Sequence, residues 1–206
     1  MTTQAPAKTE RSNLGLNTRD LINVGVFTAV YFVVMFGLGM LGLINPLVMF
    51  VGHALALIAN GVVVSLFLAR VPKFGAMTTL GVIIGLLMVV TGHYWGTLVF
   101  SGLVALVGDL IARSGNYRAP LLNSLGYAIY SLWYVAPLFP IFFDTAGYRK
   151  DLETSMSVDY ANTFMELVTP TTIVVWGIIV LVLAFVGGLL GQRVLGRHFR
   201  RAGLAR

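Results

Sequence analysis

The sequence predicts an all-α polytopic membrane protein in which six transmembrane helices form one bundle. The chain is 57% hydrophobic and only 11% charged, which excludes an ordinary soluble domain. A helix needs about 20 mainly apolar residues to cross the ~30 Å hydrocarbon core of a bilayer. Six segments reach or approach that length, with the third and fourth the shortest, and they cover residues 21–44, 47–69, 74–91, 97–112, 121–143 and 171–192.

The basic residues predict the orientation of this bundle. If the amino end lies in the cytoplasm, twelve of the fourteen Lys and Arg residues fall on the cytoplasmic side, and only Arg149 and Lys150 lie outside. Cytoplasmic loops of membrane proteins carry an excess of Lys and Arg. We therefore expect a multi-pass protein of the cell (plasma) membrane with both termini in the cytoplasm and three outer loops. The net charge of +6 then reflects contacts with anionic lipid headgroups, and we expect no nucleic-acid partner.

Three regions follow from this topology. Residues 1–18 are expected to form a disordered cytoplasmic tail followed by a helix cap at Asp20, residues 19–193 the six-helix membrane domain, and residues 194–206 a basic cytoplasmic tail. The membrane domain includes a long outer loop, residues 144–170, which holds five of the eight acidic residues. Loops longer than about 12–15 residues are usually functional covers or disordered segments, so this loop is either a lid or a solvated tether.

Motifs for common catalytic and metal sites are missing from the sequence. It has no Gly-rich loop ending in Gly-Lys-Ser or Gly-Lys-Thr for a nucleotide triphosphate, no His-Glu-x-x-His pair for zinc, and no cysteine. Asp109 is the one acid inside a predicted helix, and we expect it to pair with Arg113, four positions later on the same face. A hydrolytic set of Ser101, His93 and Asp109 is disfavoured, because roughly 18–24 Å of helix separates the last two. We predict no catalytic residue, no resident metal and no cofactor.

Small residues recur four positions apart on several predicted helices. In lipid, such pairs allow helix backbones to approach closely. Most are expected to pack inside the bundle, whereas the pair on the first helix has two interpretations, internal packing or contact with a partner subunit. The pairs are Gly25 and Ala29, Gly81 and Gly85, Gly108 and Ala112, and Gly187 and Gly191.

Several short motifs resemble those of a known family. They are Asp20-Leu21-Ile22 at the start of the first helix, Val71-Pro72-Lys73-Phe74-Gly75, Gly108-Asp109-Leu110-Ile111, Gly115-Asn116-Tyr117-Arg118 and Asn123-Ser124-Leu125-Gly126-Tyr127. Over about 180 residues the chain resembles the Trep_Strep group, also called the MptD family. Members of this group are identified as substrate-binding S components of energy-coupling factor (ECF) transporters.

The resemblance implies a substrate-capture (S) subunit of an ECF-type ABC importer, which binds a micronutrient at the outer face. Such subunits dock on a transmembrane coupling subunit and two cytoplasmic ATPases, which supply the energy for transport. The first helix of known S components presents small residues at four-residue spacing to the coupling subunit, and Gly25 and Ala29 match that place. An autonomous small-solute carrier is the alternative function, since six helices suffice to line a path.

The resemblance also implies a binding site where the outer loops meet the outward halves of the later helices. Aromatic side chains there provide stacking surface for a planar ligand, and a few polar groups orient it. Trp and Tyr also gather at membrane interfaces without any ligand, and this interpretation stays open for Tyr130, Trp133 and Tyr134. The candidate residues are Asn45, His53, His93, Tyr94, Trp95, Tyr130, Trp133, Tyr134, Asn162 and Glu166.

His93 and His53 are the candidates with the most specific chemistry. His93 lies between two glycines in a short aromatic loop, and His53 lies ~9 Å into the second helix from its outer end. Two imidazoles facing one pocket suit a metal, or a metal-bearing ring such as haem or another tetrapyrrole. A lone histidine is more often an ordinary packing residue, and the sequence leaves both interpretations open.

Overall fold

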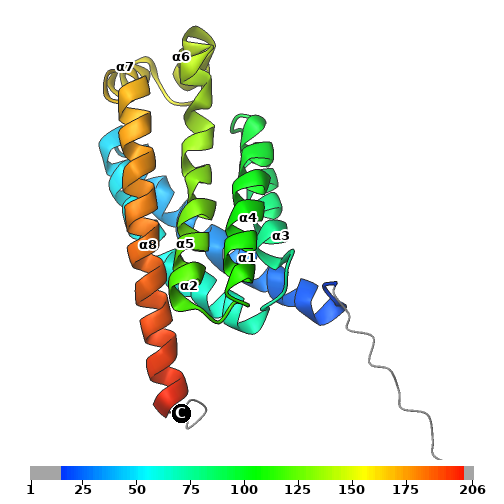
Figure 1. Cartoon of the computed structure of the whole chain (residues 1–206). Coiled ribbons are helices and arrows are strands. Elements are labelled where there is room, and N and C mark those ends of the chain that lie inside the picture. Colours follow the sequence, from blue (N-terminus) through cyan, green and yellow to red (C-terminus); the bar gives the residue numbers. More distant parts are fainter. Residues whose placement is uncertain (1–14, 202–206) are drawn as a thin grey trace, which may run out of the picture.

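The computed structural model describes residues 15–201 of the chain, and the side chains of residues 15–197. Within this range the regular structure is helical (Figure 1). The predicted tails therefore lie largely outside the described residues, although the last helix continues to Arg201. The elements are α1 (Thr18–Gly39), η1 (Met40–Leu43), α2 (Pro46–Arg70), α3 (Ala76–Val90), α4 (Gly96–Ser114), α5 (Pro120–Ser131), η2 (Leu132–Phe142), α6 (Thr145–Ser155), α7 (Val158–Leu167) and α8 (Pro170–Arg201).

Each of the six apolar segments corresponds to a helix or to a pair of consecutive helices. Five of them are long and apolar enough to cross a bilayer: α1 with η1, α2, α4, α5 with η2, and α8. The third segment forms only the 15-residue helix α3. At 1.5 Å per residue it is ~22 Å long, which is shorter than the ~30 Å hydrocarbon core. The structure thus supports a polytopic membrane protein with five candidate spans and one shorter apolar helix beside α4.

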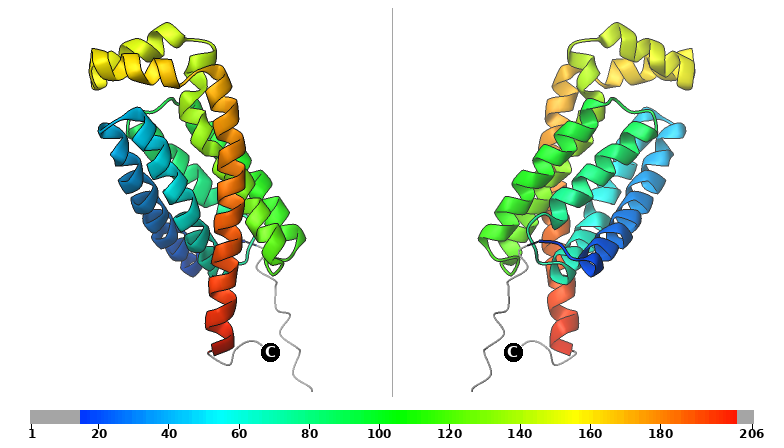
Figure 2. Two further views of the ribbon diagram at one scale, coloured as in Figure 1. Left: turned by 90° about the vertical axis from the view of Figure 1, so that its left-hand side faces the viewer. Right: turned by 90° about the vertical axis from the view of Figure 1, so that its right-hand side faces the viewer.

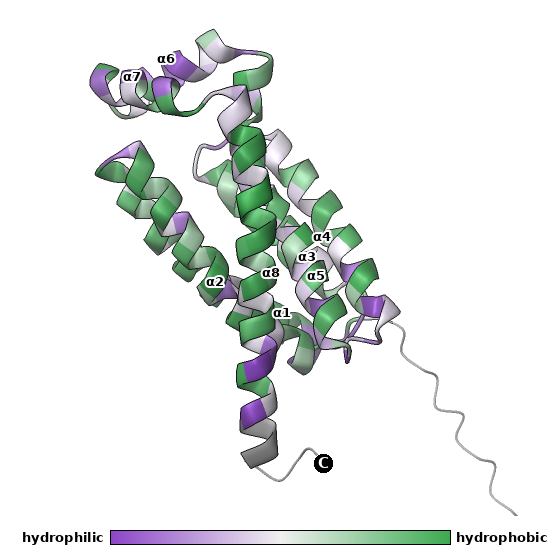
Figure 3. Ribbon diagram, turned by 60° about the vertical axis from the view of Figure 1, so that its left-hand side comes forward, coloured by the Kyte–Doolittle hydropathy of each residue, from purple (hydrophilic) through white to green (hydrophobic). Residues whose placement is uncertain are grey.

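The two ends of the bundle differ in structure and in charge. Helices α6 and α7 lie across one end, which we call the cap end (Figure 2). The start of α1 and the end of α8 lie at the opposite end, which we call the basic end (Figure 1). Hydrophobic residues dominate the helices between the two ends, as Figure 3 shows. The basic end carries Arg70, Lys73, Arg113, Arg118 and Arg193.

The start of α1 differs from the prediction. Asn17, not Asp20, is the N-cap, and the two residues form a capping box in which each side chain accepts a hydrogen bond from the other's backbone N–H. The Asp20 carboxylate also pairs with Lys73 at 2.7 Å, which fixes the start of α1 against the loop before α3. Asp20 therefore fastens two helices at the basic end and does not itself begin the helix.

Glycines hold the long helices in close contact. A Cβ atom on Gly61 of α2 would collide with the backbone of Gly187 on α8, and one on Gly108 of α4 would collide with the backbone of Gly126 on α5. Gly25 differs, because a Cβ there would meet nothing within 4 Å. The pairs on α3, α4 and α8 therefore pack inside the bundle, whereas the pair on α1 faces outward.

The fifth apolar segment is not a single α-helix. It is α-helical up to Ser131 and then continues as the 11-residue 3₁₀ segment η2, which contains Pro137 and Pro140. Proline has no backbone N–H and crowds the preceding turn, so an α-helix does not continue through two of them. The tighter 3₁₀ winding places Trp133 and Tyr134 side by side, with ring centroids 4.5 Å apart, near the cap end.

The predicted ion pair between Asp109 and Arg113 is wrong. The buried Asp109 carboxylate accepts hydrogen bonds from the Gly75 N–H, from the Thr78 N–H and hydroxyl, and from the Tyr117 hydroxyl, at 2.8–3.1 Å. It thereby caps the start of α3 from a different helix. The Arg113 guanidinium lies over the Phe74 ring instead, 4.8 Å from its centroid.

Candidate functional site

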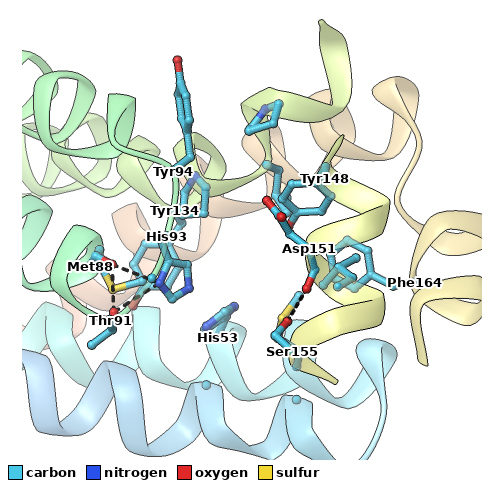
Figure 4. A pocket seen from close by; sticks show the side chains of 18 of the residues that line it. His53, Met88, Thr91, His93, Tyr94, Tyr134, Tyr148, Asp151, Ser155 and Phe164 are labelled. Atoms are coloured by element: carbon cyan, nitrogen blue, oxygen red, sulfur yellow. Dashed lines mark hydrogen bonds between the residues drawn. The ribbon is translucent and has the colours of Figure 1, made fainter. Parts of the chain in front are cut away.

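A cavity of about 920 Å³ lies at the cap end of the bundle. Its walls come from η1 and the ends of α1, α2 and α8, from the loop between α3 and α4, from η2 and from α6 and α7. The cap helices α6 and α7 lie across this end of the bundle (Figure 2), and the cavity lies between them and the bundle and is partly open. Figure 4 shows side chains that line it. Its volume falls in the range of cavities that hold a small organic ligand, roughly 300–1,000 Å³.

Six of the ten predicted site residues line this cavity, on three different parts of the chain. His53 comes from α2, and Tyr134 with its neighbour Trp133 comes from η2. The loop before α4 supplies the rest, and Tyr94 there packs against Trp95 at 5.4 Å between ring centroids. The six are His53, His93, Tyr94, Trp95, Trp133 and Tyr134.

The other four predicted residues do not line the cavity. Asn45 is the N-cap of α2, where its side chain accepts a hydrogen bond from the Leu47 N–H at 2.8 Å. Tyr130 is buried below the cavity beside Tyr31. On α7, the side-chain oxygen of Asn162 accepts a hydrogen bond from Arg149, and Glu166 is exposed.

His93 is held in one tautomer by two neighbours on α3 and the following turn. Its Nδ1 lies 3.2 Å from both the Met88 carbonyl and the Thr91 hydroxyl. The Thr91 hydroxyl already donates to the Met88 carbonyl at 2.8 Å, so Nδ1 must carry the proton and act as the donor. Nε2 is then an acceptor. Figure 4 shows the ring bonded along one edge, with the other edge turned towards the cavity.

Burial keeps this ring neutral. Removal from water lowers the pKa of His93 below its ordinary value, and the hydrogen bond to the Met88 carbonyl only partly opposes that shift. At neutral pH the cavity therefore contains an imidazole lone pair and not an imidazolium. This group can accept a hydrogen bond from a ligand or coordinate a metal.

His53 is packed tightly by its neighbours. Its ring meets the Tyr134 ring edge to face, with centroids 5.3 Å apart. A Cβ atom on Gly39 would lie 2.7 Å from Nε2 of His53, so any larger residue at position 39 would push the imidazole ring aside. His53 makes no hydrogen bond to any other residue that the structure describes.

The two histidines lie on adjoining walls of the cavity (Figure 4). Among the described residues, no group of three or more His, Cys, Asp or Glu side chains is placed to hold a metal ion. A protein site made from the pair alone would therefore leave several positions of a metal open. Ligation of a metal-bearing ring by His53 and His93 stays a prediction.

Five of the chain's eight methionines line the cavity, a feature that the sequence analysis missed. Methionine is unbranched and polarizable, so it adapts to irregular ligands and makes favourable contacts with aromatic rings. In the sequence four of these residues look like ordinary positions of apolar helices, and the fifth, Met156, lies in the predicted outer loop. One usable signal was the four-residue spacing of Met49 and His53 on α2. The five are Met35, Met40, Met49, Met88 and Met156.

The cap is helical, although the sequence analysis expected a loop over residues 144–170. The Asp144 side chain caps α6 by accepting from the Gly147 N–H, and the Ser157 side chain caps α7 by accepting from the Tyr160 N–H. These two caps were readable signals. Arg149 joins the two helices, because it bonds Glu153 of α6 and Asn162 of α7.

The inner face of the cap is aromatic. Phe164 is only 3% exposed and stacks near Tyr148, with ring centroids 5.9 Å apart. Burial, with smaller effects from Tyr160 and Asp151, raises the pKa of the Tyr148 hydroxyl, which therefore stays protonated. Of the two interpretations of residues 144–170, the arrangement favours a lid over a solvated tether, because these rings line the cavity.

Beneath the cavity lies a polar cluster with missing partners. The Trp133 indole N–H donates to the Tyr31 hydroxyl at 3.0 Å. Nearby, the hydroxyls of Tyr130 and Tyr134 and the side-chain oxygen of Asn60 are buried and make no hydrogen bond of ordinary geometry in the described part of the chain, although both hydroxyls lie within interaction range of Tyr31. Unpartnered polar groups are costly inside a membrane, so a polar ligand group or a water at this depth would be stabilised.

The residues of the disfavoured hydrolytic set do not meet. The Ser101 hydroxyl donates to the Gly81 carbonyl at 2.7 Å. His93 lies before α4 at the cap end, whereas Asp109 lies near the far end of that helix. No Ser-His-Asp geometry arises among these three side chains.

Residues 18–201 match a protein family described as hypothetical bacterial integral membrane protein (Trep_Strep). The match covers the whole bundle together with its cap. No curated protein and no solved structure matches the chain.

Proposed function

Since the chain belongs to the Trep_Strep family of bacterial integral membrane proteins, we propose that it is the substrate-capture (S) subunit of an ECF-type importer in the cell membrane. It binds a micronutrient in the cavity at the cap end and delivers it inward by docking on a coupling subunit and two ATPases. The cap end then faces outward and the basic end lies in the cytoplasm, in agreement with the excess of Lys and Arg on cytoplasmic loops. The capped cavity of about 920 Å³ carries the proposal.

The cavity lining supports a ligand that is mainly apolar and partly planar. Aromatic rings and methionines form most of the wall, and both favour flat, polarizable molecules. A few polar groups can orient such a ligand, among them His93 on one side and Asp144 and Asp151 on the cap. This is the composition expected of a specific small-molecule site, with an apolar surface and a small number of placed polar atoms.

The need for an energising partner rests on the sequence. The chain has no nucleotide-binding loop of the usual kind, and its described residues form one bundle with its cap. The proposal therefore assigns ATP hydrolysis to other subunits.

The outward face of α1 supports a docking role. Gly25 is open to its surroundings, and Ala29 lies one turn later on the same exposed face. Small residues in lipid allow another helix to approach closely, which large side chains prevent. We propose this face as the contact with the coupling subunit.

Docking and ligand capture can be tested separately. We expect Gly25→Leu and Ala29→Leu to abolish co-purification with the coupling subunit while ligand binding is kept. Ala59→Leu is the matched control, because Ala59 is equally exposed on α2 and should leave both intact. Unchanged complex yield in both α1 variants would remove this docking face.

The function itself is tested by mass spectrometry of small molecules that co-purify with the chain from its native host. A stoichiometric ligand that is lost in His93→Ala and Trp133→Ala would support capture in the cavity. Transport by the chain alone, in liposomes without ATPases, would instead support the autonomous carrier.

A further inference from the structure

A second, smaller cavity lies at the side of the bundle, between the ends of α2 and α8 that are nearest the cap. Its volume is about 190 Å³. Thr172 is the one polar side chain in its wall, and all the others are apolar or aromatic. They are Leu47, Phe50, Leu167, Thr172, Val175, Trp176 and Ile179.

Two residues belong to the walls of both cavities. Phe50 of α2 and Trp176 of α8 line the small lateral cavity and also the large capped cavity. Their rings meet edge to face, with centroids 4.8 Å apart and planes at 75°. This aromatic pair therefore forms the partition between the two spaces.

The mouth of the lateral cavity faces the membrane. Leu47 is 59% exposed, Val175 48% and Ile179 40%, and all three lie on helices that are long and apolar enough to cross a bilayer. A polar solute gains nothing from such a surface, whereas a molecule dissolved among lipid tails meets no desolvation penalty there. The chemistry of the mouth selects for lipid-soluble molecules.

We propose that Phe50 and Trp176 form a gate through which a lipid-soluble ligand enters the capped cavity sideways from the bilayer. The inference rests on the proposed function, because it takes the capped cavity as the binding site. It adds a route and a substrate class: a small, apolar, at least partly planar molecule that partitions into the membrane.

Opening this gate breaks the edge contact between the two rings. The pair makes one edge-to-face contact, and such a contact changes an equilibrium constant about two- to tenfold. Both side chains have only two side-chain torsions, so a change of rotamer at either ring is the movement that the gate requires.

The gate can be tested with the chain in liposomes and an aryl diazirine photoprobe dissolved in the bilayer. Labelling is followed in time by mass spectrometry at Met88 and Trp133, which are 5% and 1% exposed and line only the large cavity. Val33, 68% exposed to lipid, is the internal standard for probe concentration.

We expect Phe50→Ala to accelerate labelling of Met88 and Trp133 about two- to tenfold relative to Val33, since it removes the partition. Val175→Trp should slow it by filling the mouth. Phe100→Ala is the matched control for the first variant, because Phe100 and Phe139 form a similar edge contact at 4.9 Å but line neither cavity. Val182→Trp, on the exposed face of α8, is the control for the second.

Equal labelling rates at Met88 and Trp133 in all four variants and the wild type would overturn the gate while leaving the capped cavity as a site reached from the cap. No labelling of these two residues in any variant, with Val33 labelled normally, would overturn the capped cavity as a site for apolar ligands, and the gate with it. The two failures are thereby distinguished.

Discussion

The hydrogen bond from the Trp133 indole to the Tyr31 hydroxyl, 3.0 Å long, ties the floor of the capped cavity to α1. Trp133 lines the cavity, whereas Tyr31 lies on the buried face of α1, opposite the outward residues Gly25 and Ala29. The helix proposed to dock therefore also contacts the floor of the proposed binding site. A ligand that moves Trp133 would act directly on α1.

The first prediction removes this bond. In Tyr31→Phe the buried Trp133 N–H loses its acceptor, which should lower the free energy of unfolding by ~1–3 kcal/mol. We also expect weaker retention of the co-purified ligand, because the cavity floor is no longer fixed. Thermal unfolding in detergent measures the first effect and mass spectrometry the second.

Tyr127→Phe is the control for this variant. The Tyr127 hydroxyl is equally buried and donates to the Leu57 carbonyl at 2.7 Å, but Tyr127 does not line the cavity. It should lose stability and keep its ligand. Equal ligand retention in the two variants would contradict a role for Tyr31 at the cavity floor.

The second prediction concerns pH. Because the folded-state pKa of His93 lies below its ordinary value of 6.5, the unfolded chain binds the proton more readily. This contribution to stability is therefore complete above pH 6.5 and is lost as the pH falls through the lowered pKa. We expect the melting temperature to fall between about pH 7 and pH 5, and to fall less in His93→Gln.

The glutamine variant is informative because its amide can still donate to the Met88 carbonyl but does not titrate. An identical fall in wild type and variant would show that His93 is not the group responsible.

The helices of the bundle were predictable because a helix that crosses lipid needs a long, continuous apolar segment. Such a segment can be recognised in the sequence without knowing which other helices it contacts. The break at Ser131 followed from Pro137 and Pro140, which the apolar count overlooked. The cap helices were missed because residues 144–170 were interpreted from their length alone, without a search for helix N-cap residues. Asp144 and Ser157, each followed by a turn of helix, were the available signals.

The candidate site was predicted in part, and the misses have a common cause. Residues on the correct loop or helix face, such as His93 and Tyr134, line the cavity. Asn45 has the expected location, but its side chain accepts a hydrogen bond from the Leu47 N–H at the start of α2 and does not face the cavity. Asp109 was assigned to its sequence neighbour Arg113, whereas its partners come from another helix and a loop, and sequence spacing does not reveal contacts between elements.

The third prediction contrasts two glycines. Gly61→Ala should destabilise the fold, since its Cβ would collide with the backbone of Gly187 and force α2 away from α8. Gly37→Ala should be neutral or stabilising by ~0.5–1 kcal/mol, because a Cβ there meets nothing within 4 Å and alanine favours helix. Melting temperatures in detergent give the sign of each change. A gain of stability in both variants would show that helix propensity, and not the contact between α2 and α8, governs the effect.

The last prediction tests the cap. Phe164 is almost fully buried on α7 and packs near Tyr148 of α6 above the cavity, so Phe164→Ala removes the contact that holds the two helices over the ligand. The ring also packs near Tyr160 of α7, so the loss should appear mainly as faster opening of the cap. We expect ligand dissociation to accelerate about tenfold, the change produced by ~1.4 kcal/mol.

Hydrogen exchange measures the same opening without a ligand. Amides of residues 145–167 should exchange faster in Phe164→Ala, while those of α2 and α8 keep their protection. Met165→Ala is the matched control, since Met165 lies on the same helix, packs against the core and does not line the cavity. Faster exchange without faster ligand release would mean that the cap folds over the cavity but does not retain its contents.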